Sequence, residues 1–179
     1  MFKNGSRFLM LGLFFLGLTG CAGLTTKYEP KGTDDSLVVG VTSFKIEANS
    51  SGDSVNLYGE HTNGIKVGIK QVGSNKIFTF TSTGSDGLVV GRLQPGQYEV
   101  IRFSIEKENK KGRTSRTITP GNTVKFSVTA GEIVSIGSWD WTLTKYGETD
   151  VLRNQRDVRS LFEARYPESL WLERKWNVD

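Results

Sequence analysis

The sequence predicts a mainly β protein, an antiparallel β-sandwich of seven to eight strands followed by a short C-terminal helical segment. Apolar and polar residues alternate with period two through most of residues 37–145, which indicates strands with one face buried. Clusters of Gly, Pro, Asn and Asp separate these stretches at short, regular intervals, as turns do. No helical pattern lies between the strands, and this favours an antiparallel sandwich over a parallel sheet.

The first half of this region contains a series of short strands. We expect them at 37–47, 64–72, 76–82 and 88–93, with a further short strand at 55–58 inside a loop rich in Gly, Ser and Asn. In the stretch 64–72, Ile65, Val67 and Ile69 share one face while lysines and a glycine occupy the other, so this strand is half-buried.

The second half contains longer strands and one strongly polar segment. A strand follows the Pro95-Gly96 turn, and Ile101, Phe103 and Ile105 share one of its faces. Residues 106–116 are too polar to pack and predict an extended hairpin loop. Two strands follow, at 124–128 and 132–144, and the second changes face near Gly137, where a β-bulge would explain the shift of phase.

The pattern lengthens to a helical period after residue 144. Asp150 is a candidate N-cap for a helix in which Val151, Val158 and Phe162 form an apolar stripe. Pro167 can open a second short helix that carries Leu170, Trp171 and Trp176. We expect this tail, residues 146–179, to cover an open edge or end of the sandwich.

The N-terminal stretch has the layout of an export signal. Lys3 and Arg7 precede an apolar run at 8–18, and small residues lead from that run into Cys21. A helix of this length reaches only about 17 Å, whereas a bilayer span needs about 20 apolar residues. The run is therefore a poor permanent membrane span.

The tetrapeptide Leu18-Thr19-Gly20-Cys21 resembles the lipobox of bacterial lipoproteins. The resemblance covers the first 21 residues and implies that residues 1–20 are a signal peptide, that the Cys21 thiol receives diacylglycerol and that Cys21 becomes the first residue. The alternative is an ordinary secretory signal with an incidental cysteine. Ala22 fits lipoproteins that pass to the outer membrane. Residues 21–36 lack apolar periodicity and predict a flexible tether about 20 Å in root-mean-square length.

Charge and cysteine count limit the function classes. Of the 179 residues, 23 are Lys or Arg and 19 are Asp or Glu, and removal of Lys3 and Arg7 with the leader lowers the net charge from +4 to about +2. This near balance does not support nucleic acid as a partner. With the single cysteine consumed by lipid, no thiol remains for a disulfide, a zinc ligand or a nucleophile.

A second resemblance concerns the sandwich. The residues Leu93, Pro95, Gly96, Tyr98 and Val100 reproduce the Leu-x-Pro-Gly-x-Tyr-x-Val element of transthyretin-like sandwiches, including carboxypeptidase-regulatory-like and pilin-B-type domains. The match covers about 60 residues of the chain. It implies a transthyretin-like or Ig-like fold, and such families are mostly binding or structural modules, so no catalytic residue is carried over.

Few residues are candidates for chemistry. His61 is the only histidine, and it lies in a polar loop. The chain has no Gly-x-Ser-x-Gly elbow, so a Ser-His-Asp triad is not indicated. A zinc site usually needs two or three histidines, so a zinc site is not indicated either. Asp53, Glu60 and Asp86 lack the spacing of a calcium loop. We expect no catalytic residue, no metal and no cofactor.

Two surfaces are candidates for binding. Trp139 and Trp141 lie two apart and share one strand face, where they either pack beneath the C-terminal helix or form an aromatic platform for a glycan or peptide. The predicted hairpin loop at 106–116 is basic and contains Lys110, Lys111 and Arg113. This loop is either merely solvated or in contact with anionic lipid headgroups.

These observations predict a lipid-anchored envelope protein that is neither an enzyme nor a nucleic-acid binder. The body at 37–145 would be attached to the outer membrane through Cys21 and would act as a structural or protein-interaction module for an envelope partner. The alternative function is a ligand-binding module for glycan or peptidoglycan fragments that uses the aromatic strand face.

Overall fold

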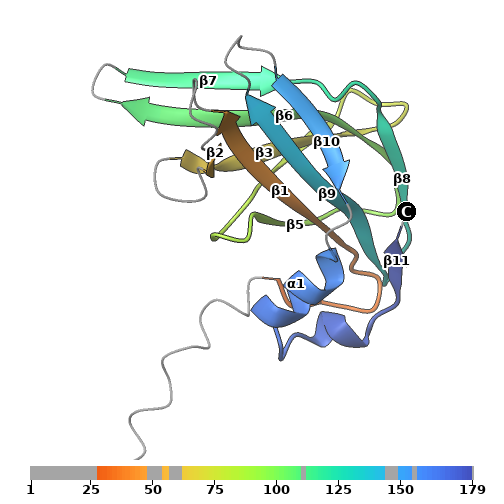
Figure 1. Ribbon diagram of the computed structural model, residues 1–179. Helices are drawn as coiled ribbons and strands as arrows, with labels where there is room; N and C mark the ends of the chain where they lie inside the picture. Colours follow the sequence, from red (N-terminus) through yellow and green to blue (C-terminus); the bar gives the residue numbers. More distant parts are fainter. Residues whose placement is uncertain are drawn as a thin grey trace, which may run out of the picture.

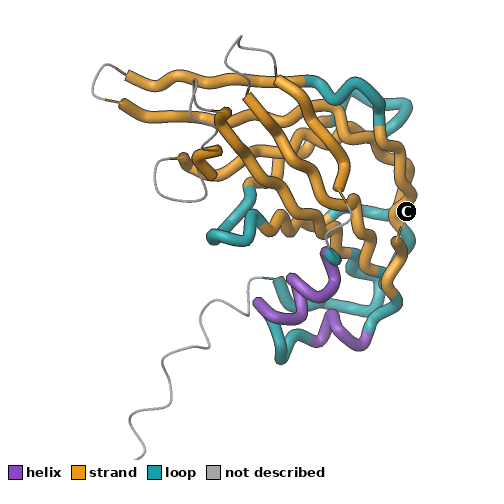
Figure 2. Tube along the Cα trace, viewed as in Figure 1, coloured by secondary structure: helices purple, strands orange, loops and turns teal. Residues whose placement is uncertain are grey.

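The computed structural model describes residues 28–47, 54–56, 62–109, 112–143, 149–154 and 157–178. Within them the protein is mainly β, with two sheets, one short α-helix and one 3-10 turn (Figures 1 and 2). No helix in these residues is long and apolar enough to cross a membrane.

Sheet A contains six strands and sheet B contains five. The strands of sheet A are β1 Leu37–Glu47, β2 Ser54–Asn56, β5 Leu88–Arg92, β9 Ile133–Leu143, β10 Thr149–Asn154 and β11 Trp176–Val178. Those of sheet B are β3 Thr62–Gln71, β4 Ile77–Thr81, β6 Gly96–Asn109, β7 Gly112–Ile118 and β8 Val124–Val128. The described residues thus hold more strands than the seven or eight expected, and β7, β10 and β11 lie where a loop or helices were predicted.

The expectation of a wholly antiparallel fold is wrong for sheet A. β1 pairs with β9 in parallel, and β11 also pairs with β9 in parallel. Short turns fix the relative direction only of strands that follow one another along the chain. β1 and β9 are remote in sequence, so their relative direction was not constrained by any turn.

The main core lies between the two sheets. Val38 and Ile136 of sheet A meet Val67, Val100 and other apolar residues of sheet B in one buried cluster. Phe78 and Phe80, which we expected to point inward, are partly buried against this cluster. Phe103 and Ile105 of β6 lie in this core as expected. Ile101 does not share their face: Val100 takes its place in the core, where the pairing of β6 with β3 shifts register between Gly68 and Ile69.

A second core covers the outer face of sheet A. Leu37, Val39 and Val41 of β1 pack there with Phe162 and Trp171 from the C-terminal segment. β1 is thus buried on both faces, which accounts for its nearly continuous apolar sequence. Figure 1 shows α1 beneath the sheet, in contact with the lower parts of β1 and β9.

The C-terminal segment differs from its prediction in position. The helix α1 spans Val158–Arg165, and its N-cap is Asp157, not Asp150, which lies in β10. The Asp157 carboxylate accepts from the backbone N–H of Ser160. The second helix is the 3-10 turn η1, Leu170–Glu173, capped by Ser169 and not begun by Pro167. The final strand β11 then adds to sheet A.

The predicted bulge near Gly137 is confirmed. The register between β1 and β9 shifts between Val39 and Val41, opposite Ser135 and Ser138. Gly137 has a φ of +85°, a conformation that side chains with a Cβ rarely adopt. The bulge changes which face of sheet A the following residues occupy, and so it places Trp139 and Trp141 in the inter-sheet core.

Candidate functional site

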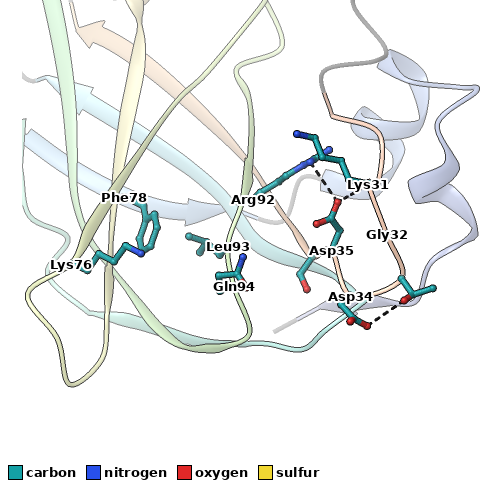
Figure 3. Close-up of a pocket in the computed structure, with 11 residues that line it drawn as sticks. Lys31, Gly32, Asp34, Asp35, Lys76, Phe78, Arg92, Leu93 and Gln94 are labelled. Atoms are coloured by element: carbon teal, nitrogen blue, oxygen red, sulfur yellow. Dashed lines mark hydrogen bonds and ion pairs between the residues drawn. The ribbon is translucent and has the colours of Figure 1, made fainter.

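The strongest candidate site is a cleft of about 710 Å³ between the N-terminal segment and sheet B. We call residues 28–36 the N-terminal strap. Figure 3 shows the strap on one side of the cleft, Lys76 and Phe78 on the other, and Arg92 reaching toward the strap between them. The described lining residues are Lys31, Gly32, Thr33, Asp34, Asp35, Ser36, Lys76, Phe78, Arg92, Leu93 and Gln94.

Arg92, at the end of β5, joins the cleft to the strap. Its Nη1 lies 3.5 Å from Oδ2 of Asp35, and its Nη2 donates to the backbone carbonyl of Glu29. The Nε atom is buried and has no hydrogen-bond partner among the described residues. The same Asp35 carboxylate accepts from the backbone N–H of Lys31 at 2.5 Å. Through these bonds Arg92 attaches the strap to β5.

The opposite wall combines a cation with an aromatic ring. Lys76 Nζ lies 4.8 Å from the centroid of the Phe78 ring, within the range of a cation–π interaction. The Phe78 ring also makes an edge-on contact with the ring of Tyr98, with centroids 6.0 Å apart. The cleft therefore presents charges of both signs beside one aromatic face, groups that suit a polar occupant such as a peptide segment.

The polar groups of the cleft are mainly lysine, arginine and aspartate side chains. Its described lining residues include neither histidine nor cysteine. Ser36, the buried hydroxyl among them, donates to the backbone carbonyl of Thr129 at 2.7 Å and is not paired with a base. In the part of the chain that the structure describes, no three His, Cys, Asp or Glu side chains gather in a way that could hold a metal ion.

The strap is also fixed from its other side by the C-terminal segment. Trp171 Nε1 donates to the backbone carbonyl of Tyr28, and the backbone N–H of Leu170 donates to the Glu29 carboxylate at 3.0 Å. Arg174 donates to the carbonyls of Gly32 and Thr33 at 3.4 and 3.2 Å. Residues 28–36, expected to belong to the flexible tether, are thus bonded to the domain.

The two tryptophans expected either beneath the C-terminal helix or in an aromatic platform lie inside the sandwich. Trp139 and Trp141 do share one face of β9, but they are only 4% and 2% exposed. Their rings contact Phe103 and Phe44, with centroids 5.2 and 5.1 Å apart. They do not lie beneath the C-terminal helix, which covers the opposite face of sheet A. Neither ring is available to a ligand at the surface.

The indole nitrogens of Trp139 and Trp141 differ in their hydrogen bonding. Trp139 Nε1 donates to the carbonyl of Ile136 at 3.0 Å, across the bulge. Trp141 Nε1 is buried and finds no acceptor among the described residues. The Arg153 guanidinium lies 6.0 Å from the Trp139 ring centroid. These contacts are those of structural core residues.

The remaining predicted site residues are not brought together by the described part of the fold. Cys21, Lys110 and Lys111 lie outside the described residues, as do His61, Asp53 and Glu60. Arg113 lies in β7, opposite Glu108 of β6, but its side chain is not among those described. Asp86, once weighed as a calcium ligand, forms an ion pair with Arg165 at 2.6 Å.

Sequence reasoning missed the cleft and the strap. Two signals could have indicated them. Tyr28 is an aromatic residue inside an otherwise polar stretch, and Arg92 is a charged residue at the end of the apolar run 88–91. Neither signal names its partner, because the strap contacts residues about 60 to 140 positions away in the chain.

Comparisons with protein-family models, with curated proteins and with solved structures found no significant match to this chain. The site and the fold therefore have to be interpreted from the residues themselves.

Proposed function

We propose that this protein is a lipid-anchored protein of the bacterial envelope, a non-enzymatic structural or protein-interaction module held at the outer membrane by diacylglycerol on Cys21. The observation that carries the proposal is the order of the first 21 residues: Lys3 and Arg7, the apolar run at 8–18, then Leu-Thr-Gly-Cys with the only cysteine of the chain. Two or three acyl chains hold a protein on a membrane far more firmly than one.

The fold supports an interaction role within this proposal. The charged cleft beside the strap offers both signs of charge and an aromatic ring, while the strand pair β6–β7 extends a polar ribbon from sheet B. Such features suit recognition of a polar protein segment. Because Trp139 and Trp141 are buried, the glycan-platform alternative has lost the observation that motivated it, and we do not propose it.

We further propose that the sandwich is transthyretin-like. The Leu-x-Pro-Gly-x-Tyr-x-Val element forms the crossover from β5 in sheet A to β6 in sheet B. Within it Tyr98 is fully buried, and its hydroxyl donates to the carbonyl of Gln94 at 2.8 Å. A tyrosine that bonds back to the chain a few residues upstream is a corner device of Greek-key sandwiches.

The lipidation is tested by expressing the full chain and its Cys21→Ser variant in a Gram-negative host with radiolabelled palmitate. We expect label and membrane association for the wild-type chain and loss of both for the variant, with Ala22→Ser as a control that keeps the cysteine. Mass spectrometry of the N-terminal peptide should identify diacylglycerol on Cys21. An unmodified Cys21 in a mature, exported chain would refute the proposal.

The interaction role is tested by a photo-crosslinking residue at position 76, in the cleft, and by a matched one at exposed position 125 on β8. We expect a discrete adduct from position 76 in the native envelope and none from position 125. Equal, diffuse labelling from both positions would count against the cleft as the contact surface.

A further inference from the structure

The first described residue, Tyr28, is attached to the core of the protein. Its carbonyl accepts from Trp171, and its ring makes an edge-on contact with Tyr166 at 6.1 Å. Trp171 is fully buried, so this anchor belongs to the core beneath sheet A. We call the end of the molecule formed by the strap, α1 and η1 the strap end.

The connection from Tyr28 to the proposed lipid is short. Seven residue steps separate Cys21 from Tyr28. Even a fully extended chain of that length spans at most about 25 Å. Tyr28 is therefore never farther than about 25 Å from a lipidated Cys21 at the membrane surface.

The β6–β7 hairpin projects to a different end of the molecule. Gln94 lines the cleft beside the strap, and β6 begins two residues later. With 14 residues, β6 carries the chain about 40 to 45 Å away from that cleft before the hairpin. Figure 1 shows the hairpin and α1 at well-separated ends of the body.

We infer that the lipidated protein rests with its strap end against the bilayer surface and presents the β6–β7 hairpin away from that surface. The inference depends on the proposed lipidation of Cys21. The opposite orientation, hairpin down, would lift the strap about 40 Å from the surface, which the connection of about 25 Å does not permit.

The strap end also carries an apolar residue suited to this position. Leu170 is 55% exposed, and its backbone N–H bonds Glu29, next to the exit at Tyr28. Exposed acidic and basic side chains both lie at the strap end, among them Glu168 and Glu173 and also Lys31 and Arg159, so we expect no strong attraction of this surface to anionic lipid. The length of the connection excludes the inverted orientation, and apolar contact at Leu170 favours the proposed one. The orientation should therefore be the same in neutral bilayers.

The orientation is tested in nanodiscs of phosphatidylcholine that contain a fraction of headgroup nitroxide lipid. Lipidation blocks the only native thiol, so an introduced cysteine can carry one fluorophore. The lipidated full chain is prepared as Leu170→Cys and, as the matched exposed position in β7, as Ser115→Cys. We expect at least threefold stronger quenching at position 170 than at 115, unchanged by 0.5 M salt.

A lengthened connection provides the control. Insertion of about 20 Gly and Ser residues after Thr26 adds a coil of about 25 Å in root-mean-square length, and the quenching ratio should fall toward one. If the lipidated protein is quenched equally at both positions, or more strongly at 115, the orientation is refuted while the lipid anchor stands. If mass spectrometry finds Cys21 unmodified in the mature chain, the anchor and the orientation fail together.

Discussion

At the scale of single residues, the sandwich depends on places where only a small side chain fits. Gly91 of β5 faces the ring of Phe80 on the opposing sheet, and a Cβ built at Gly91 would lie 2.3 Å from a ring carbon. Gly121, in the turn before β8, has nothing within 4 Å of the same point. A substitution at Gly91 therefore tests packing between the sheets, while the same substitution at Gly121 measures the effect of replacing a glycine without a packing clash.

We expect Gly91→Ala to lower the free energy of unfolding by about 1–3 kcal/mol, because the Phe80 ring must move or the sheets must separate. Gly121→Ala should change it by less than about 1 kcal/mol in either direction. Urea unfolding followed by tryptophan fluorescence measures both. Equal midpoints for the two variants would show that the sheets adjust freely at Gly91.

A second constraint at this scale is electrostatic. The Asp157 carboxylate accepts from the Ser160 hydroxyl at 2.6 Å and from the Ser160 backbone N–H at 3.1 Å. The hydrogen bond from the Ser160 hydroxyl is the main cause that lowers the pKa of Asp157 below its usual value. The ionised form is therefore favoured by the fold, and its stabilisation is present at neutral pH and lost as pH falls through the lowered pKa.

We expect Asp157→Ala to lower the free energy of unfolding by about 1 kcal/mol, since the cap of α1 is lost. Asp157→Asn keeps an acceptor and should lose less at pH 7, while its stability should fall less steeply than that of the wild type between pH 5 and 2. Unfolding curves at several pH values measure the slopes. Identical slopes for wild type and Asp157→Asn would contradict a role for the lowered pKa.

At the scale of the elements, the bulge in β9 links the sequence pattern to the core. If the same sequence continued past Gly137 in strict period two, without a bulge, Trp139 and Trp141 would turn toward α1 and Ile133 would keep its present side. With it, the tryptophans enter the inter-sheet core while Ile133 packs under the C-terminal segment. One strand thus supplies large residues to two cores.

We expect Gly137→Ala to cost about 1–2 kcal/mol, because alanine at a φ of +85° is strained. Gly137→Asn should cost less, since Asn adopts this region more readily. In both variants the new Cβ would meet the far end of the Arg153 side chain, with Nε at 2.9 Å, so packing adds little to the difference between them. Thermal unfolding of the two variants gives the order, and a larger loss for Asn than for Ala would argue against backbone strain as the cause.

The elements also show how far the sequence could predict the fold and the site. Period two located β1, β3, β4, β5, β8 and β9 closely, and the change of phase at Gly137 located the bulge. The pattern could not show that β7 is a strand, because a polar ribbon such as Glu106 opposite Ser115 is held by backbone bonds and needs no apolar face. Trp176 similarly reads as helical until its pairing with Ile133 is known.

The candidate site was less predictable than the fold, because it depends on contacts between residues that are remote in the sequence. The shared face of Trp139 and Trp141 follows from their spacing, but whether that face is solvent or core depends on the opposing sheet, which supplies Phe103. The cleft forms only where Arg92 meets Asp35 and Glu29, and the spacing of these residues carries no periodic signal. Long-range pairs of this kind become visible only in three dimensions.

At the scale of the whole molecule, the N-terminal strap joins the body to whatever lies before residue 28. It contributes the Tyr28 ring to the outer core, an acceptor for the buried indole of Trp171 and two oxygen partners for Arg92. With Cys21 lipidated as proposed, a strap bonded to the core would fix the position of the folded body relative to its anchor. This makes the strap a structural element and not only a connection.

Two truncations test this view. A chain that begins at Tyr28 should unfold at nearly the same urea concentration as one that begins at Ala22. A chain that begins at Leu37 lacks the strap, which leaves Trp171 Nε1 and the Arg92 guanidinium without their described partners, and we expect it to lose about 2–4 kcal/mol. Trp171 should also become accessible to acrylamide, because the backbone at Tyr28 no longer covers its edge. If the chain from Leu37 is as stable as the chain from Tyr28, the strap contacts contribute nothing to folding, and the exit point used to orient the protein on the membrane would not be fixed.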